Sequence, residues 1–189
     1  MGVVRDLVVV YPGGLRARYR WAGSGEAADV FALTEAGGSL IDLGPRIADD
    51  PDVLCRAELR IESPAGTWTV RLASRIYDEP TSLAWDVHSL LVVKYGFHVY
   101  GLGSRGGEAA WIYRSATPVL SVHGSSRLEH VIAVSEIETV ALGPDGGIVW
   151  KVGHSDVVSA ADLIGGRLVL TGYTGETIAL DPRTGRPLG

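Results

Sequence analysis

The sequence is 189 residues long, enough for one domain with a hydrophobic core or for two small subdomains that share one. Hydrophobic residues make up 46% and charged residues 21%, which is the composition of a globular protein and excludes a disordered chain. A formal net charge of −5 argues against nonspecific nucleic-acid binding, and a single cysteine, Cys55, excludes an internal disulfide framework and a cysteine-rich zinc site.

The first predicted element is a β-hairpin near the N-terminus. Between Leu15 and Trp21 every second residue is arginine, and a strand sends successive side chains to opposite faces. The three arginines therefore share one face and the apolar residues share the other. The turn Pro12-Gly13-Gly14 joins this strand to the apolar run Leu7 to Tyr11.

A second amphipathic hairpin is predicted over residues 55–76, with its turn at Ser63-Pro64-Ala65-Gly66. Between the two hairpins, residues 26–36 fit a short helix or a strand, and we favour the strand. Gly37-Gly38 followed by residues 39–43 then makes a third hairpin, and residues 49–52 are expected to form a surface loop.

Three glycines in the second half, Gly107, Gly146 and Gly185, are separated by a constant 39 residues. A short apolar run and a polar turn precede each of them, and Trp111 and Trp150 stand four residues after the first two. A fixed period of this size is typical of stacked or radial repeats. Each of the three units contains three predicted strands. The first strand of the successive units covers residues 90–93, 131–134 and 168–171, the second covers residues 99–102, 140–142 and 178–180, and a final strand follows the glycine. The linking segments 117–123 and 157–163 offer a fourth strand.

These stretches resemble the quinoprotein-like (PQQ-like) repeat, most closely at residues 178–185. The resemblance implies β-propeller blades in which tryptophans lie between neighbouring sheets and dock one on the next. Rings of this family close with about seven or eight units, whereas three units span less than half of such a ring. In the third unit Gly189 stands where a tryptophan is expected.

The predicted fold class is therefore all-β, with antiparallel sheets forming about three propeller-like blades packed with N-terminal β-hairpins. We expect two parts: residues 1–80, whose hairpins cover the repeat half, and residues 82–189, which carry the repeats. A ring of five units with two degenerate N-terminal ones is the alternative. The family's quinone, calcium site and adjacent-cysteine disulfide find no matching residues, so we expect no cofactor, no metal and no catalytic residue.

Three sequence patterns suggest functional sites, and for each of them we favour a structural interpretation. Gly101-x-Gly103-x-x-Gly106 has the letters of a dinucleotide-binding loop, but residues 108–113 indicate a strand where that loop requires a helix, so a turn is favoured. No pair of histidines has metal-helix spacing, although rim loops of a propeller offer a way to bring His123, His154 and Asp156 together. A nucleophilic set of Ser125, His154 and Asp156 lacks a nucleophile-elbow motif.

Arginines on the polar faces of the predicted hairpins suggest a binding surface. If the strands are neighbours, the arginines form a band that glutamates partly balance, which is either ordinary ion pairing or a docking face for an acidic partner. Aromatic residues near turns of the repeat half add a second patch. The predicted binding residues are Arg16, Arg18, Arg20, Arg71, Tyr95, Phe97 and Tyr173.

The function that we expect is a non-catalytic binding module that holds another protein. Bacterial self-protection proteins that bind a toxin are one instance of this class. Leu7 to Val10 is too short for the core of a signal peptide, and no run approaches membrane-spanning length, so we expect a cytoplasmic protein without membrane or nucleic-acid partners. The alternatives are a small-ligand-binding protein or enzyme with a His/Asp site on one rim, and a fragment of a larger propeller completed by oligomerisation.

Overall fold

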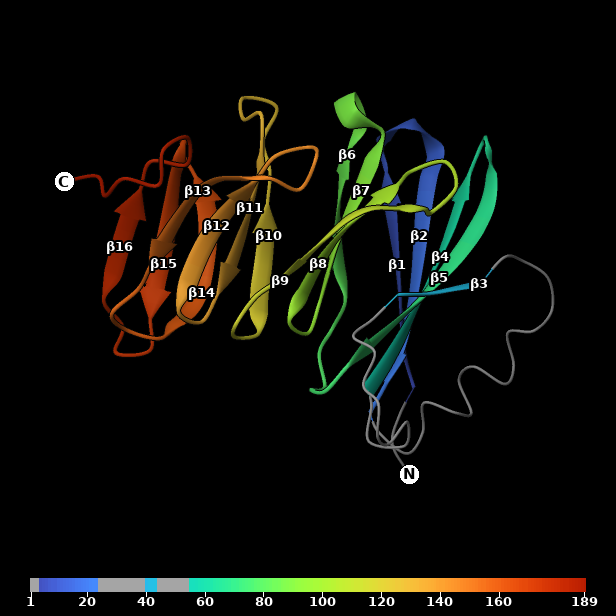
Figure 1. Ribbon diagram of the computed structural model, residues 1–189, viewed down its shortest axis with the longest axis horizontal. Coiled ribbons are helices and arrows are strands. Elements are labelled where there is room, and N and C mark those ends of the chain that lie inside the picture. The colour runs from blue at the N-terminus through green and yellow to red at the C-terminus, as the bar shows by residue number, and fades with distance from the viewer. Residues whose placement is uncertain (1–3, 24–39, 44–54) are drawn as a thin grey trace. The chain divides into compact units, whose positions relative to one another are not determined.

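The computed structural model describes residues 4–23, 40–43 and 55–189, and these contain β-strands and short 3₁₀ turns but no α-helix (Figure 1). The chain divides into two compact units. The first consists of residues 1–80 with 103–109, and the second of residues 81–102 with 110–189. The prediction for residues 26–36 and the expected loop at 49–52 lie outside the described residues.

The first unit contains one five-stranded sheet with the order β1-β2-β4-β5-β3. Its strands are β1 (Arg5–Tyr11), β2 (Leu15–Ala22), β3 (Leu40–Leu43), β4 (Cys55–Ser63) and β5 (Gly66–Ser74). Both predicted N-terminal hairpins are confirmed, because β1 pairs with β2 and β4 pairs with β5 in antiparallel register. Of the predicted third hairpin only β3 lies within the described residues, and it runs parallel to β5.

The alternation read from the sequence separates the two faces of this sheet. Ala17, Tyr19 and Leu59 are buried, whereas Arg16 and Arg18 on the opposite face are exposed. Because β2 and β4 are direct neighbours, their apolar side chains meet across the pair and form one continuous apolar face. The polar face therefore gathers the charged side chains of several strands.

The second unit holds three successive sheets with the orders β6-β7-β8-β9, β10-β11-β12-β13 and β14-β15-β16 (Figure 1). The strands of the first are β6 (Thr81–Trp85), β7 (Leu90–Tyr95), β8 (His98–Gly103) and β9 (Ala109–Arg114). Those of the second are β10 (Val119–His123), β11 (Val131–Ser135), β12 (Glu138–Leu142) and β13 (Ile148–Gly153). Those of the third are β14 (Val158–Ile164), β15 (Arg167–Gly172) and β16 (Thr177–Leu180).

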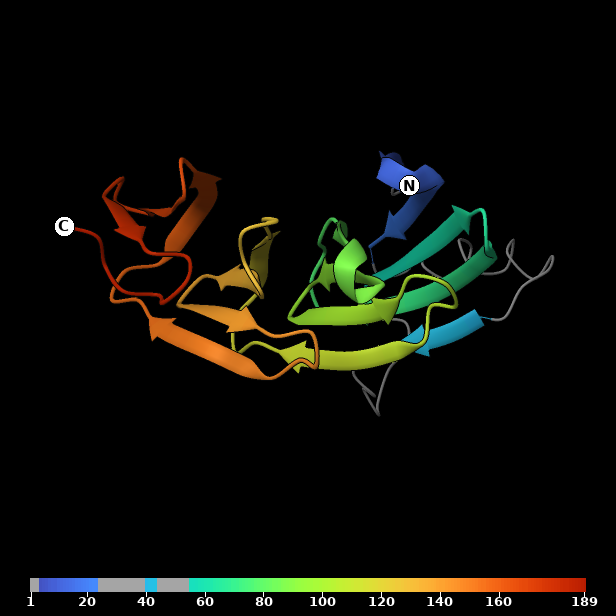
Figure 2. The same ribbon diagram turned by 90° about the horizontal axis from the view of Figure 1, so that it is seen from above.

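Each predicted repeat is therefore a small sheet, and the repeated strands are confirmed. The linking segments supply β10 and β14, as expected, and β6 opens the first sheet in the same way. In the third sheet a single bridge from Leu180 to Pro187 stands where the other sheets have a fourth strand. Seen from above, the fourth strands β9 and β13 lie along the lower side of the view, away from β6 and β10 (Figure 2).

Packing between sheets explains why β11, in the middle sheet, is almost entirely apolar in sequence. On β11, Val131 and Ala133 face the first sheet, whereas Ile132 and Val134 face the third. A strand that is covered on both faces leaves few positions for polar side chains. The first contact includes Val92, Val99, Val140 and Leu142, and the second includes Ala141, Leu168, Leu170 and Leu180.

Tryptophans lie at the joins between these sheets, as the repeat resemblance implied. The Trp111 ring covers Gly146, whose φ of +79° belongs to the left-handed region, and its Nε1 donates to the Pro144 carbonyl at 3.0 Å. Trp150 covers Gly185 in the same manner. A Cβ on either glycine would lie 2.5–2.6 Å from the tryptophan side chain, so both positions require glycine.

The first unit contains a third example of this contact. Trp68 on β5 covers Gly107, and its Nε1 donates to the Ser104 carbonyl at 3.1 Å. The sequence pattern missed Trp68 because it precedes its glycine by 39 residues (107 − 68), whereas Trp111 and Trp150 precede theirs by 35 (146 − 111 and 185 − 150).

Replacement of Gly146 by alanine tests this close approach. We expect G146A to lower the free energy of unfolding by about 2–5 kcal/mol, because a left-handed residue with a Cβ costs about 1–2 kcal/mol and overpacking adds about 1–3 kcal/mol. Gly166 has a similar φ of +74° but nothing within 4 Å of its Cβ position, so G166A serves as the matched control and should cost only the first amount. Equal losses in urea-induced unfolding would contradict a packed joint.

The indole hydrogen bond can be tested by a second pair of variants. Trp111 has a carbonyl partner, whereas Nε1 of Trp150 is buried without a hydrogen-bond partner among the described residues. Both Trp→Phe changes remove similar ring volume, but only W111F removes a hydrogen bond. We expect W111F to cost about 1 kcal/mol more than W150F in chemical denaturation, and a larger loss for W150F would refute this difference.

Candidate functional site

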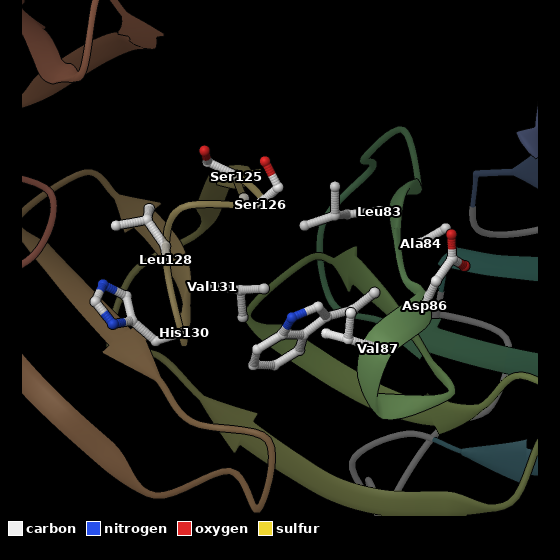
Figure 3. Close-up of a pocket in the computed structure, with 11 residues that line it drawn as sticks. Leu83, Ala84, Asp86, Val87, Ser125, Ser126, Leu128, His130 and Val131 are labelled. Atoms are coloured by element: carbon white, nitrogen blue, oxygen red, sulfur yellow. The ribbon is translucent and has the colours of Figure 1, made fainter.

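A hollow of about 320 Å³ opens in the second unit beside the end of β6 and the connection between β10 and β11 (Figure 3). Leu83, Trp85 and Val131 give it apolar walls. Ser125 and Ser126, both exposed, add hydroxyl groups at its border. An apolar cavity of this size with few polar groups is suited to receive an apolar side chain or a small apolar ligand.

A second hollow of about 420 Å³ lies on the other side of the same connection. Gly124, Ser125 and Leu128 line both hollows, so residues 124–128 form a ridge between them. The second hollow is more polar, because the exposed Arg127 and Arg183 and the partly buried Asp181 contribute to its lining. Apolar and basic recognition elements therefore lie side by side on one rim.

Local sequence explains the conformation of the ridge. The Leu128 N–H donates to the Ser125 carbonyl at 3.0 Å, and the Arg127 N–H donates to the Ser125 hydroxyl at 3.2 Å, so Ser125 closes a tight turn. Gly124 lets the chain pass close to β6, because a Cβ there would lie 2.6 Å from a methyl group of Leu83 and would displace that side chain. These contacts fix the conformation of the ridge.

His130 anchors the end of the ridge. Its ring is buried, and Nε2 lies 2.7 Å from the Pro182 carbonyl in the turn that precedes Gly185. The ring also meets the Trp150 indole edge to face, with 6.0 Å between the ring centroids. At this join His130 is hydrogen-bonded to the turn carbonyl, whereas at the other join Trp111 makes the equivalent bond. Because His130 also lines the first hollow, it connects this join to the border of that hollow.

The length of the connection is the signal that sequence analysis overlooked. Residues 124–130, seven in number, join β10 to β11, whereas Gly165 and Gly166 alone join β14 to β15. Since two residues suffice to turn the chain at the equivalent place, the longer connection is not needed for sheet formation. An insertion within a repeat of this kind could have drawn attention to residues 124–130.

The histidines suggested for a rim site have separate hydrogen bonds. His123 lies 2.8 Å from the Ser121 hydroxyl, and His154 lies 2.7 Å from the Thr139 hydroxyl. Burial lowers the pKa of both rings, against the opposing charges of Asp162 for His123 and Glu138 for His154. Asp156 accepts a hydrogen bond from Thr174 at 2.9 Å. Within the described ranges, no group of three or more His, Cys, Asp or Glu side chains is arranged to hold a metal ion.

A polar network joins the first and second sheets elsewhere in the second unit. The Tyr113 hydroxyl on β9 donates to Glu138 on β12 at 2.8 Å, and the Lys151 ammonium lies 2.6 Å from the other carboxylate oxygen. Burial alone would raise the pKa of Glu138, but hydrogen bonds from Lys151, Tyr113 and Ser115 outweigh it and lower that pKa. The carboxylate is therefore charged and structural.

The predicted arginine face exists in the first unit, but acidic side chains accompany it. Arg16 and Arg18 are exposed, while Arg20 and Arg71 are partly buried. Asp6 lies 2.6 Å from Arg18, and this hydrogen bond lowers the pKa of Asp6. Between Arg20 and Arg71 in the strand register stands Glu58, which is buried. These pairings fit ordinary cross-strand balance at least as well as a docking face.

The predicted aromatic patch requires a correction at Tyr95. This residue is 0% exposed, because it ends β7, a strand whose residues are all buried, so it cannot belong to a surface patch. Phe97 in the next turn is partly buried. Tyr173, in the equivalent turn of the third sheet, is 82% exposed and alone keeps the predicted exposure.

In the part of the chain that the structure describes, no helix is both long and apolar enough to span a membrane.

Comparison with known proteins places the fold but not the activity. No protein-family model matches the sequence, and no curated protein matches it either. Solved structures do match. HIRA residues 644–1017 share 12% identity at a TM-score of 0.53, over 98% of this chain and 52% of that one. BamB from Moraxella catarrhalis shares 15% identity at a TM-score of 0.52, over 99% of this chain and 59% of that one. BBS1N in complex with ARL6DN shares 15% identity at a TM-score of 0.51, over 99% of this chain and 54% of that one.

These structures are β-propellers, so the all-β, propeller-like fold is confirmed. Identities this low concern the fold alone. The chain spans between 52% and 59% of the length of the three structures. Membership of the PQQ-like repeat family stays a prediction.

Replacement of Glu138 by glutamine tests its structural charge. The lowered pKa means that the ionised group stabilises the fold above its unfolded pKa near 4.5, and that this contribution is lost as the pH falls through the folded pKa. At neutral pH we expect E138Q to cost about 1–3 kcal/mol in urea-induced unfolding, with the difference shrinking in acid. The exposed Glu129 provides the control E129Q, and a difference that does not change with pH would contradict the assignment.

Proposed function

We propose that this chain is a non-catalytic, propeller-type module that binds another protein through the rim formed by the ridge of residues 124–128 and its two hollows. The observation that carries the proposal is the ridge, which belongs to a seven-residue connection, residues 124–130, where two residues would close the sheet, and which lies between cavities of about 320 and 420 Å³. Binding surfaces are commonly built from loops that a rigid scaffold positions.

The structural relatives support this class of function by analogy. One of them, BBS1N, was solved in complex with ARL6DN, and other propellers are among the neighbours. A shared fold does not establish a shared partner, so the analogy supports protein binding and no specific activity. The chain's own rim supplies the chemical argument.

The chemistry of the two hollows indicates the kind of segment that fits. Leu83, Trp85 and Val131 offer an apolar seat for one aliphatic or aromatic side chain, which is a common anchor in protein interfaces. Arg127 and Arg183 outnumber the single Asp181 in the lining of the second hollow, and this balance favours a carboxylate on the same segment. We therefore expect a peptide segment that combines an apolar anchor with a nearby acidic residue.

The arginine face of the first unit is the second candidate surface for the same function. Exposed Arg16 and Arg18 support it, together with the partly buried Arg20 and Arg71. Tyr173, which is highly exposed, and Phe97 belong to the other unit and offer a further point of contact. A binding experiment must therefore separate the rim from these surfaces.

Selection of displayed random peptides against the immobilised protein tests the proposal. We expect enriched peptides to carry an apolar residue near an acidic one. Ser126→Trp fills the first hollow, and Val87→Glu, at a position 84% exposed, places a charge on its border. Each should weaken peptide binding by at least about tenfold, equivalent to about 1.4 kcal/mol, in fluorescence anisotropy.

The control is the triple variant R16E/R18E/R20E, which alters the arginine face and leaves the rim intact. Unchanged binding by this variant, with loss in S126W and V87E, supports the rim. Loss in the triple variant alone assigns binding to the arginine face instead. Peptides that bind all variants equally, or a selection without enrichment, would reject the rim.

A further inference from the structure

The third sheet of the second unit has one covered face and one open face. Leu168, Leu170 and Leu180 pack against the second sheet. The alternate residues of the same strands point the other way: Val169, Thr171 and Ala179 are half-buried, and Ala160 and Asp162 belong to the same face. This open face is independent of the rim proposed above.

The cross-strand pairs on the open face match those on the face of the second sheet that is buried against the third. In the second sheet, Ile132 lies opposite Ala141 and Val134 lies opposite Thr139. In the third sheet, Val169 lies opposite Ala179 and Thr171 lies opposite Thr177. Even the β-bulge recurs, between Val119 and Ser121 and again 39 residues later between Val158 and Ala160.

The burial of the two equivalent faces differs sharply. Ile132, Val134, Ala141 and Thr139 are all 0% exposed, and the first three pack in the cluster that the third sheet completes. Their counterparts in the third sheet remain half-buried or exposed. The third sheet therefore presents a surface whose equivalent, one repeat earlier, is an inter-sheet contact.

We propose that this open face binds a second copy of the chain, with the two open faces packed together about a twofold axis. In a twofold contact the same patch serves both copies and must complement itself. The face carries one charge of each sign, because Asp162 lies opposite Val169 and Arg167 lies opposite Ile164 on the same side. Asp162 can therefore pair with Arg167 of the partner subunit without any like-charge contact.

In the alternative head-to-tail arrangement, the open face would pack on a leucine-rich face like the one that covers the second sheet, and within the second unit that face is occupied. In this chain Ile132 and Ala141 are covered by the leucine-rich face of the third sheet, which includes Leu168 and Leu180. That face is buried in the contact with the second sheet, so it cannot also cover the open face of another copy. The corresponding face of the second sheet, with Val140 and Leu142, is buried against the first. A contact between two open faces is the arrangement that leaves these packed faces undisturbed.

Sedimentation velocity over a wide range of protein concentrations tests the proposal on the full chain. We expect a reversible shift from a mass of 20.0 kDa to twice that value. Ala179→Arg should raise the dimer dissociation constant at least about tenfold, which corresponds to about 1.4 kcal/mol. Val149→Arg is the matched control, because Val149 is 55% exposed on β13 and lies outside the open face.

Charge reversal gives a second test that does not disturb the apolar centre. Asp162 and Arg167 are both exposed, so the variants are expected to fold normally, as near-ultraviolet circular dichroism would verify. D162R and R167D should each weaken the dimer, and the double variant should restore it. A monomer at every concentration, a dimer unaffected by A179R, growth beyond a dimer, or failure of the double variant to restore association would each overturn the twofold contact.

Discussion

The repeat part of this structure depends on the contact between an indole ring and a glycine turn of the next sheet. At Gly146 and Gly185 the backbone adopts a left-handed conformation that also leaves no space for a Cβ beneath the tryptophan. One residue type thus satisfies two demands, the turn and the close approach. Because Trp68 and Gly107 form the same contact within the first unit, the device extends beyond the repeats that the sequence displays.

The joins are similar in shape but differ in their polar chemistry. Trp111 and Trp68 both donate to turn carbonyls, whereas at Gly185 the Pro182 carbonyl is bound by His130 and the Trp150 Nε1 has no partner among the described residues. An unpaired buried donor reduces stability unless its surroundings compensate for it. His130 also borders the first hollow, so the join that is least regular is the one connected to the candidate binding rim.

Local signals predicted the fold well and the candidate site poorly. Alternation identified the hairpins, and the 39-residue period identified the sheets, because both patterns record which face of a strand is buried. The prediction that Tyr95 belongs to a surface patch was wrong. Both faces of β7 are buried, so its sequence lacks the alternation that would have shown Tyr95 to be a core residue. The Glu138 network and the two hollows depend on residues brought together from different sheets, which one strand's pattern cannot encode.

Charge and loop length together explain why the rim is the stronger functional candidate. On the first unit, arginines stand among Asp6, Glu58 and Glu62, and exposed ion pairs such as Arg18–Asp6 contribute only about 0–1 kcal/mol. Such a face can arise from strand alternation alone. The connection at residues 124–130 cannot, since Gly165-Gly166 performs the same turn with two residues. Where repeated strands are held alike by packing, a feature that differs between repeats and is not needed for folding is the better indication of binding.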